Sequence, residues 1–325
     1  MSQTHSTTTV TQERLSGVIL VAPHQFPGLE REKRLAEEFG IELVAARDVQ
    51  EFRARIPEAA VILLTPYAKI EARDFEAMRH CRAVVRYGIG YDNVDVDAAR
   101  RARVPVSIVP GASSLEVASH ALAMGIALVR RIPQGQNAIA SGGWAGNLAF
   151  DAPKLDELRV AVIGMGRIGR QVALWYRALG ADVRVYDPFI EVSDFPAAPL
   201  DELLVTSDIV SLHVPLSKDT ASLISADVLT RMPRGAVIVN VSRGGLIDES
   251  ALAEALRTGR IAGAGLDTFG QEPLPSEHPL RSAPNLILTP HMAWRSNRAL
   301  DALQNGVIER ARKALLGEPL LDVVT

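Results

Sequence analysis

Three glycines and one aspartate stand at a spacing that suits the binding of phosphates and a sugar. Gly164, Gly166 and Gly169 form the pattern G-x-G-x-x-G directly after the β-branched run 159–163. In such a turn the first glycine permits a tight bend, the second lets the backbone approach a pyrophosphate, and the third lets helix and strand pack closely. Free N–H groups and the positive end of the helix dipole then attract the phosphates. The pattern predicts a dinucleotide-binding βαβ unit.

Asp187 supplies the acid that such a unit needs. It follows a second predicted strand and lies 23 residues after Gly164, close to the roughly 20 residues at which an acid hydrogen-bonds the ribose 2′-OH. Its carboxylate would repel the 2′-phosphate of NADP, so NAD is the expected cofactor. Arg167 and Arg184 keep NADP open as a less favoured alternative.

Three ionisable residues stand just past predicted strands later in the chain. They are Arg243, Glu272 and His291. The carboxyl ends of strands in a doubly wound parallel sheet line the crevice that holds the cofactor. Each residue also has an ordinary explanation, such as capping a turn or facing solvent. Their shared position predicts that they act together on the nicotinamide side.

A second glycine loop, Arg86 to Asn93, follows a predicted strand near the start of the chain. Gly88 and Gly90 are two residues apart, so backbone N–H groups there can converge on an anion. The alternative is a tight strand–helix connection that binds nothing.

Short apolar runs alternate with helical stretches around these motifs. The predicted strands are 18–22, 41–44, 61–64, 83–87, 106–109, 159–163, 182–186, 209–213, 236–240, 261–266 and 286–288. The predicted helices include 30–39, 49–55, 71–80, 94–102, 117–131, 200–204, 226–231, 249–257 and 292–316. Such alternation indicates parallel sheets covered on both faces. We therefore predict an α/β fold with two Rossmann-like doubly wound parallel-sheet domains and a cleft between them.

The domains are predicted to divide the chain unevenly. Residues 16–112 and 292–325 form a flavodoxin-like substrate domain, and residues 113–291 form the NAD-binding domain. Pro110-Gly111-Ala112 marks the boundary. Ser113 to Glu116 then matches a capping box, S-x-x-E, at the start of a helix.

The crossover helix 117–131 is apolar nearly all round, which predicts burial on all sides, including against a second subunit. Residues 132–158 are rich in proline and glycine and are predicted to form an extended arm. Together these features predict a homodimer. His120 within the helix is interpreted as a packed core histidine and not a ligand.

The composition limits the classes of protein and partner. The chain has 325 residues, 47% of them hydrophobic, which suits two domains of ordinary size. Its net charge of −3 does not indicate a nucleic-acid or anionic-membrane partner. A single cysteine, Cys81, excludes an internal disulfide and a metal site with two cysteines, so no metal is expected. Residues 1–15 are predicted to be a disordered tail and not a signal peptide, and the expected location is cytoplasmic.

The combined motifs resemble the D-isomer-specific 2-hydroxyacid dehydrogenases, and the resemblance extends from Gly17 to Pro319. It is carried by Val162 to Gly169, Ser211-Leu212-His213-Val214-Pro215-Leu216, Asn240-Val241-Ser242-Arg243-Gly244, Gly265-Leu266-Asp267 with Glu272-Pro273-Leu274, and Thr289-Pro290-His291. Val85 to Asp95 and His291-Met292-Ala293-Trp294 are most similar to the branch that includes the C-terminal-binding-protein co-repressors.

The resemblance implies an oxidoreductase that interconverts a 2-oxo acid and a D-2-hydroxy acid by hydride transfer. Arg243 would grip the substrate carboxylate and polarise the C2 carbonyl. His291 would donate a proton to the carbonyl oxygen. Glu272 would hydrogen-bond the imidazole and favour its protonated form.

The resemblance also implies binding residues. Together with the glycine turn and Asp187, the cofactor set is Gly164, Gly166, Arg167, Ile168, Gly169, Asp187, His213, Val214, Pro215, Thr220, Val241, Ser242 and Asp267. The substrate set is Arg86, Gly88, Ile89, Gly90 and Trp294. Trp294 has an alternative role in packing between domains, and Arg295 beside it would attract a second acid group on the substrate.

Two other functions stay open. One is an NAD(H)-sensing co-regulator, which a peptide-binding groove would favour and the intact set of Arg243, Glu272 and His291 disfavours. The other is oxidation of a different small anion, such as formate or phosphite. A substrate screen separates the latter, because a fold does not determine its substrate.

Overall fold

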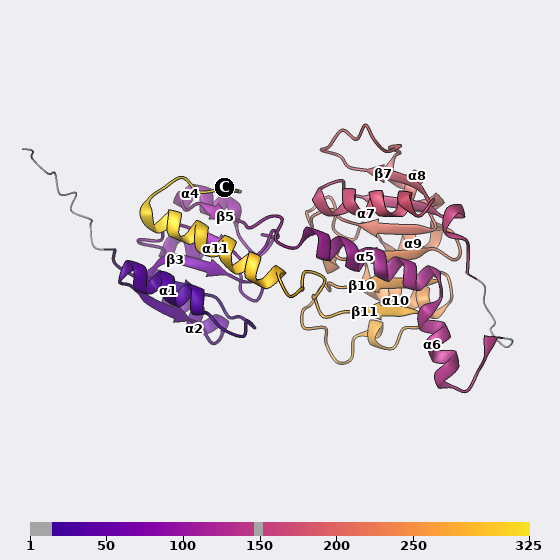
Figure 1. The fold of residues 1–325 in the computed structure, drawn as a ribbon, viewed down its shortest axis with the longest axis horizontal. Helices are drawn as coiled ribbons and strands as arrows, with labels where there is room; N and C mark the ends of the chain where they lie inside the picture. The colour runs from indigo at the N-terminus through magenta and orange to yellow at the C-terminus, as the bar shows by residue number, and fades with distance from the viewer. Residues whose placement is uncertain (1–14, 146–151) are drawn as a thin grey trace, which may run out of the picture. The chain divides into compact units, whose positions relative to one another are not determined.

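Two units, each built on its own parallel sheet, make up the part of the chain that the computed structural model describes, residues 15–145 and 152–325 (Figure 1). The first unit comprises the described residues up to Ala112 together with Leu300–Thr325, and the second comprises Ser113–Ala299. The α/β class with two parallel-sheet units is confirmed. The predicted disordered tail lies, except for Leu15, outside the described residues.

The first unit has a five-stranded sheet in the order β2-β1-β3-β4-β5. Its strands are β1 (Val18–Val21), β2 (Glu42–Ala45), β3 (Ala59–Leu64), β4 (Val84–Arg86) and β5 (Val106–Ser107). Its helices are α1 (Glu30–Phe39), α2 (Val49–Arg55), α3 (Ala72–Ala77), α4 (Val96–Ala102) and α11 (Ala299–Leu316).

The second unit has a six-stranded sheet in the order β11-β10-β9-β8-β6-β7. Its strands are β6 (Arg159–Ile163), β7 (Asp182–Tyr186), β8 (Ile209–Leu212), β9 (Val237–Asn240), β10 (Gly263–Leu266) and β11 (Leu286–Leu288). Its helices are α5 (Ser114–Val129), α6 (Ile132–Ala140), α7 (Arg167–Ala178), α8 (Leu200–Thr206), α9 (Ala226–Arg231) and α10 (Glu249–Arg257).

The strands of the second sheet end in one row. Tyr186, Ile163, Leu212, Asn240, Leu266 and Leu288 are successive neighbours in the parallel register. The residues that follow them therefore leave the sheet at the same edge. The strand order reverses between β6 and β8, which is where open α/β sheets bind ligands.

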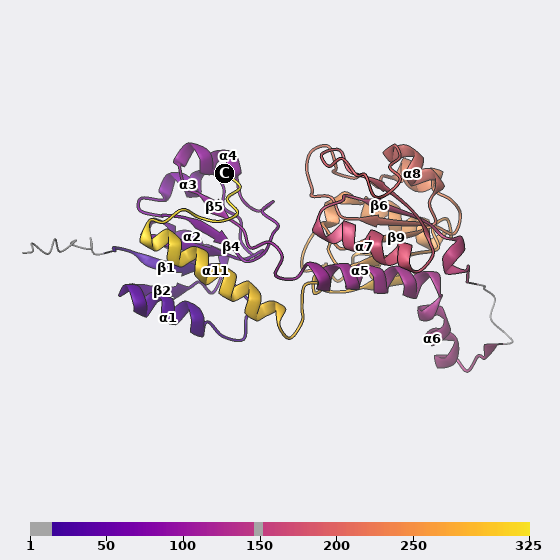
Figure 2. The same ribbon diagram turned by 45° about the horizontal axis from the view of Figure 1, so that its top comes forward.

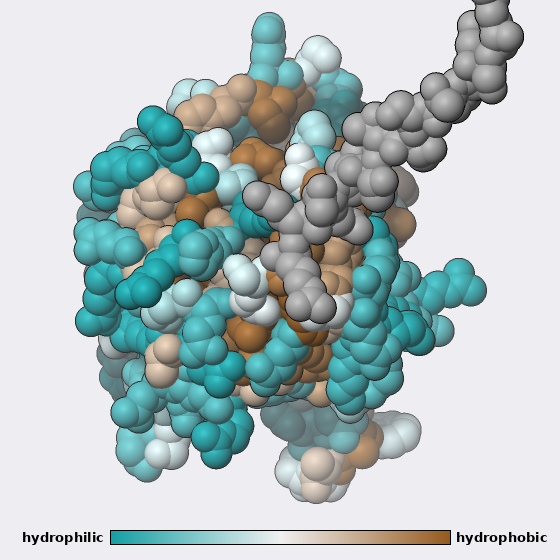
Figure 3. Space-filling view, turned by 90° about the vertical axis from the view of Figure 1, so that its left-hand side faces the viewer, coloured by the Kyte–Doolittle hydropathy of each residue, from teal (hydrophilic) through white to brown (hydrophobic). Residues whose placement is uncertain are grey.

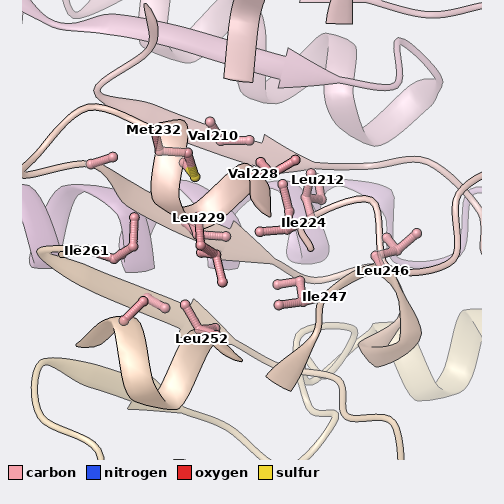
Figure 4. Close-up of a cluster of buried hydrophobic side chains, with 14 of the residues drawn as sticks. Val210, Leu212, Ile224, Val228, Leu229, Met232, Leu246, Ile247, Leu252 and Ile261 are labelled. Atoms are coloured by element: carbon pink, nitrogen blue, oxygen red, sulfur yellow. The ribbon is translucent and has the colours of Figure 1, made fainter. Parts of the chain in front are cut away.

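Alternation along the strands divides the core of the second unit between two faces. Val160 and Val162 pack with α5 and α7, which lie side by side over one face (Figure 2). Ala161 and Ile163 belong to the cluster on the opposite face, formed with α8, α9 and α10. Figure 4 shows this cluster, in which Val228 and Leu229 of α9 meet residues of β8 and α10. Both faces are apolar, as expected of a parallel sheet covered twice.

In the first unit, α1 and α11 lie side by side although they are far apart in sequence. Arg31 of α1 donates to Asp301 and Gln304 of α11, and Arg312 pairs with Glu38. On the face of this unit turned to the viewer in Figure 3, hydrophilic side chains cover most of the surface and apolar ones show between them.

No helix in the described residues is long and apolar enough to cross a lipid bilayer.

The prediction of an extended arm over 132–158 is wrong for its first part. Residues Ile132–Ala140 form α6. Pro133 lies in the first turn, where the missing N–H would have no partner within the helix in any case. Gly135 weakens a helix without ending it. Residues 146–151 of the predicted arm lie outside the described residues.

The last helix and the return to the first unit begin later than predicted. α11 begins at Ala299, whereas the prediction was Met292. Residues 292–298 form turns before it, and the N–H groups of Met292 and Ala293 donate to the Asp267 carboxylate, each at 2.9 Å. Ala293 is 4% exposed and packs in the core of the second unit. These contacts keep residues 292–299 with that unit.

The predicted capping box at 113–116 does not form. Ser113 is the N-cap of α5, but its side chain makes no capping hydrogen bond. The Glu116 carboxylate instead accepts the hydroxyl of Ser296 at 2.9 Å. A contact distant in sequence therefore replaces the local motif.

Candidate active site

The predicted cofactor residues gather along one edge of the second sheet. The residues that directly follow its strands are Asp187, Gly164, His213, Val241, Asp267 and Thr289. All but Thr289 belong to the predicted cofactor set. Arg243 and His291 come two residues further along their loops, and Glu272 lies in the loop after β10.

The glycine turn is as tight as its sequence predicts. Gly164 has φ +99°, and a Cβ there would lie 2.7 Å from the carbonyl oxygen of His213. A Cβ at Gly169 would lie 1.9 Å from the carbonyl oxygen of Gly164. Only hydrogen fits at these two positions, so β6 and α7 pack at backbone distance.

Gly166 differs, because its outer side is open. It is the N-cap of α7, no side chain caps that helix, and a Cβ at Gly166 would meet nothing within 4 Å. Arg167 is exposed and Ile168 is half-buried against the core. An uncapped helix N-terminus with free space in front of it fits a pyrophosphate.

Asp187 lies against this turn. Its Oδ2 accepts the N–H of Met165 at 2.7 Å, and its Oδ1 accepts those of Phe189 and Ile190 at 2.9 and 3.1 Å. A carboxylate has about four acceptor sites, so these three bonds leave room for a ribose hydroxyl. Arg184, which kept NADP open, is engaged instead with Glu202 at 3.4 Å and Asp182 at 3.5 Å.

His213 is neutral at the end of β8. Burial lowers the pKa of His213 to about 3, because the charged imidazolium would lose its hydration. Its Nε2 lies 2.8 Å from the Ser211 hydroxyl, and its Nδ1 has no hydrogen-bond partner among the described residues. Val214, the next residue, is 7% exposed.

Other predicted cofactor residues use their polar groups to shape the loops. The Ser242 hydroxyl donates to the carbonyl of Leu212 at 3.0 Å, which ties the loop after β9 to β8. The Thr220 hydroxyl donates to the carbonyl of Pro215 at 2.8 Å and closes the loop after β8. Val241 is 8% exposed.

The structure brings two of the three predicted catalytic side chains together. His291 Nδ1 lies 2.7 Å from Glu272 Oε2, and both side chains are 32% exposed. Glu272 Oε1 accepts the N–H of Phe269 at 3.0 Å, which fixes the carboxylate. Burial alone would raise the pKa of Glu272, but the hydrogen bond from His291 and the charges of His291 and Arg243 outweigh it and hold that pKa below its usual range. Glu272 is therefore a carboxylate at neutral pH.

Arg243 is half-buried in the loop after β9. Its NH1 donates to the carbonyl of Ser242 at 2.7 Å, and its charge contributes to the lowered pKa of Glu272. Asn240, which is fully buried, holds this loop by donating to the Arg243 carbonyl at 2.8 Å and accepting the Ser242 N–H at 3.0 Å.

His291 adopts a left-handed backbone conformation with φ +50°, which is uncommon for a residue with a side chain. Its N–H donates to the main-chain carbonyl of Asp267 at 2.8 Å. Trp294 supports the same turn, since its Nε1 donates to the His291 carbonyl at 3.0 Å. The guanidinium of Arg295 lies 6.0 Å from the Trp294 ring centre.

The predicted substrate loop belongs to the first unit. Gly88 has φ +118°, and the Arg86 guanidinium fills the side where its Cβ would stand, at 2.7 Å. Arg86 is 7% exposed, whereas Ile89 is 48% exposed.

Sequence reasoning gave no role to Asn240 or Thr289, and it interpreted His120 as core packing. A buried amide at the end of an otherwise apolar strand was the available signal for Asn240. His120 and Thr289 contact each other from segments 169 residues apart, which no local pattern reveals. Among the described residues, no three His, Cys, Asp or Glu side chains are grouped so that they could hold a metal ion.

Comparison with known proteins identifies the family of the chain. The family model "D-isomer specific 2-hydroxyacid dehydrogenase, NAD binding domain" matches residues 122–293. The chain is 38% identical over 268 residues to glyoxylate reductase of Korarchaeum cryptofilum, covering 79% of each chain. It is 34% identical over 312 residues to D-3-phosphoglycerate dehydrogenase of Mycobacterium tuberculosis, covering 94% of this chain and 58% of that protein.

Solved structures share the fold. D-lactate dehydrogenase of Aquifex aeolicus, solved with NAD and lactic acid, has a TM-score of 0.85 and 25% identity and covers 92% of this chain and 96% of its own. The chain spans about half the length of the phosphoglycerate dehydrogenases it matches. A closest relationship to the C-terminal-binding-protein branch stays a prediction. The chain belongs to the D-isomer-specific 2-hydroxyacid dehydrogenase family, and its second unit contains the NAD-binding domain of that family.

Proposed function

We propose that the chain is an NAD-dependent oxidoreductase that interconverts a 2-oxo acid and a D-2-hydroxy acid. In the reductive direction, a 2-oxo acid, NADH and one proton give the hydroxy acid and NAD⁺. The observation that carries this proposal is the 2.7 Å hydrogen bond between His291 and Glu272 at the sheet edge that also bears the glycine turn.

His291 is proposed to be the proton donor. Because Nδ1 donates to the Glu272 carboxylate, the proton on Nε2 is the one that the imidazolium can release. Glu272 fixes this ring orientation through its hydrogen bond to Nδ1. In the oxidative direction the neutral ring takes the proton back.

Arg243 is proposed to bind the substrate carboxylate and to polarise the C2 carbonyl. A planar guanidinium with several donors matches a planar carboxylate, which a lysine does not. The charge of Arg243 helps to lower the pKa of Glu272, which supports a role for both residues at the same end of the sheet.

The glycine turn and Asp187 are proposed to hold the dinucleotide. Bound NADH supplies the hydride. The open side of Gly166 receives the pyrophosphate at the N-terminus of α7, and the remaining acceptor site of Asp187 takes a ribose hydroxyl. The ionised carboxylate disfavours a 2′-phosphate, so NAD is preferred over NADP.

NADH oxidation followed at 340 nm against a panel of 2-oxo acids tests this function. The panel includes glyoxylate, hydroxypyruvate, pyruvate, phenylpyruvate, 4-methylthio-2-oxobutyrate and 2-oxoglutarate. We expect turnover of at least one acid and a fall in kcat of roughly 10²- to 10⁴-fold in His291→Ala, as for loss of a general acid. The control His80→Ala changes an exposed histidine of the first unit and is expected to keep full activity.

The same panel, extended to NAD⁺ reduction with formate and with phosphite, separates the alternatives. NADH binding without turnover of any acid would contradict the enzyme proposal and favour an NAD(H)-sensing co-regulator. Turnover of formate or phosphite with NAD⁺, and of no 2-oxo acid, would favour oxidation of another small anion.

A homodimer is also proposed, through α5 and the segment that follows it. No residue of α6 is buried, and Ile132, Ile139 and Trp144 are 58%, 55% and 73% exposed. Large exposed apolar side chains grouped in one segment are typical of an interface. Analytical ultracentrifugation of the chain checks this, with Ile139→Asp expected to shift the dimer towards monomer.

The substrate-binding set stays a prediction; it comprises Arg86, Gly88, Ile89, Gly90 and Trp294. A cytoplasmic location also stays a prediction. The identity of the 2-oxo acid is a question for the same panel. Preference for an acid with a second carboxylate, lost in Arg295→Ala, would support a role of Arg295 in selecting the substrate.

A further inference from the structure

One buried carboxylate ties down the residues on both sides of His291. Asp267 is 1% exposed. Its Oδ1 accepts the hydroxyl of Thr289 and the N–H of Met292, and its Oδ2 accepts the N–H of Ala293. The main-chain carbonyl of Asp267 also accepts the His291 N–H at 2.8 Å.

His120 extends this set of contacts from α5. Its Nε2 lies 3.0 Å from the Thr289 hydroxyl oxygen and 3.8 Å from Asp267 Oδ1. A threonine hydroxyl has one proton, and Thr289 uses it on the carboxylate. The hydroxyl oxygen therefore accepts from His120, which requires a proton on Nε2. The result is a directed chain of hydrogen bonds from His120 to Thr289 to Asp267.

These hydrogen bonds support the backbone of His291. A left-handed conformation is costly for a residue with a side chain and persists only where its surroundings hold it. Asp267 provides that support through Met292 and Ala293 only while its carboxylate keeps one orientation. A buried carboxylate keeps its orientation when its donors are complete.

We infer that Thr289 and His120 are positioning residues that hold Asp267, and through it the turn carrying His291. This inference rests on the proposed function, in which His291 donates the proton. It assigns to the two residues an effect on the chemical step that is larger than their effect on the binding of the dinucleotide, for which Asp267 is itself predicted.

A matched pair of variants isolates the Thr289 hydroxyl. Thr289→Val keeps the shape and removes the hydroxyl, whereas Thr289→Ser keeps the hydroxyl. We expect Thr289→Val to lower kcat about ten-fold, the loss that one charge-assisted hydrogen bond corresponds to. The Kd for NADH, from fluorescence titration, is expected to change less than kcat, and Thr289→Ser is expected to keep the wild-type kcat. Thr206→Val is the control, since the Thr206 hydroxyl donates to the main-chain carbonyl of Glu202 within α8.

Hydrogen exchange gives a readout that does not depend on activity. In Thr289→Val the amides of Met292 and Ala293 are expected to exchange faster, measured by mass spectrometry of the peptide that contains them. Thr206→Val is expected to leave this peptide unchanged. General destabilisation would instead raise exchange in many peptides.

His120 is tested in the same way. His120→Gln keeps a donor near the position of Nε2, and His120→Leu removes it. We expect His120→Leu to lower kcat less than Thr289→Val does, and the double variant to be no slower than Thr289→Val alone, because both changes break one chain. Additive losses would contradict the chain. If Thr289→Val does not fold, the His120 pair carries the test.

The outcomes separate this inference from the proposed function. If wild-type protein reduces a 2-oxo acid and Thr289→Val matches it in kcat and in exchange, the inference is wrong and the function stands. If wild-type protein reduces no acid, the function fails, and exchange at Met292 and Ala293 still decides whether Thr289 holds this turn.

Discussion

Two glycine loops follow strands in this chain, and they differ in what comes next. The loop at 164–169 leads directly into α7, whose N-terminus no side chain caps. The loop at 88–90 is followed by residues 91–95 before α4 begins, and Asp95 caps that helix by accepting the Ala98 N–H at 2.9 Å. The Asp95 carboxylate therefore already occupies the N-terminus of α4.

The first glycine is equally tight in the two loops. A Cβ would lie 2.7 Å from the His213 carbonyl oxygen at Gly164 and 2.7 Å from the Arg86 guanidinium at Gly88. Glycines two residues apart thus do not by themselves define a dinucleotide site. The helix that follows at once, with no capping side chain, is the feature that distinguishes the loop at 164–169.

The largest effect is expected at Gly169, where the second unit has no space for a side chain. In Gly169→Val the new Cβ would stand 1.9 Å from the Gly164 carbonyl oxygen, so β6 and α7 must separate. We expect the free energy of unfolding to fall by about 3 kcal/mol, the upper range for overpacking, and NADH binding to be lost. Urea denaturation followed by circular dichroism measures the first effect.

Gly135→Val is the matched control for this change. Gly135 lies within α6, and a Cβ there would meet nothing within 4 Å. A valine is expected to change the free energy of unfolding by less than about 0.5 kcal/mol. Equal free energies of unfolding for Gly169→Val and Gly135→Val would mean that the glycine turn between β6 and α7 has room for a side chain.

A second, smaller effect tests the missing cap by supplying one. In Gly166→Asp a carboxylate at the N-cap of α7 is expected to raise stability by a few tenths of a kcal/mol. The same charge would repel the pyrophosphate and weaken NADH binding by about 2 kcal/mol, or roughly 30-fold in Kd. Stability and affinity then change in opposite directions. Gly166→Asn, which caps without charge, is expected to weaken binding less, and an unchanged Kd in Gly166→Asp would argue against a phosphate here.

The dinucleotide unit was predictable because all its signals are local. The β-branched strand at 159–163, the glycine spacing and Asp187 lie within one short stretch, and the structure has each element where the pattern predicts it. His291 and Glu272 were singled out by their positions past strand ends, and their hydrogen bond was implied by the family resemblance. Their contact follows from parallel strands that end at one edge.

What could not be predicted depends on contacts between distant segments. Residues 292–298 have the composition of a helix start, but the amides of Met292 and Ala293 bind Asp267 and the segment forms turns instead. The sequence places Glu116 where it would complete a capping box, but its carboxylate accepts the Ser296 hydroxyl instead. Pro133 and Gly135 favour an irregular arm, but a proline in the first turn leaves α6 intact. In each case a single partner or position outweighs the local pattern.

The smallest effect is expected from removing the cap of the first unit. Asp95→Ala deprives the N-terminus of α4 of its acceptor and is expected to cost about 1 kcal/mol of stability. Asp248→Ala removes the same kind of cap from α10 in the second unit, where Asp248 accepts the Ala251 N–H at 3.0 Å, and serves as its matched control. Urea denaturation measures both changes. The Kd for NADH is expected to stay at its wild-type value in Asp95→Ala, because residues 91–95 still separate α4 from the glycines of its loop. A gain in NADH affinity on uncapping α4 would show that the Asp95 cap, and not this separation, distinguishes the two loops.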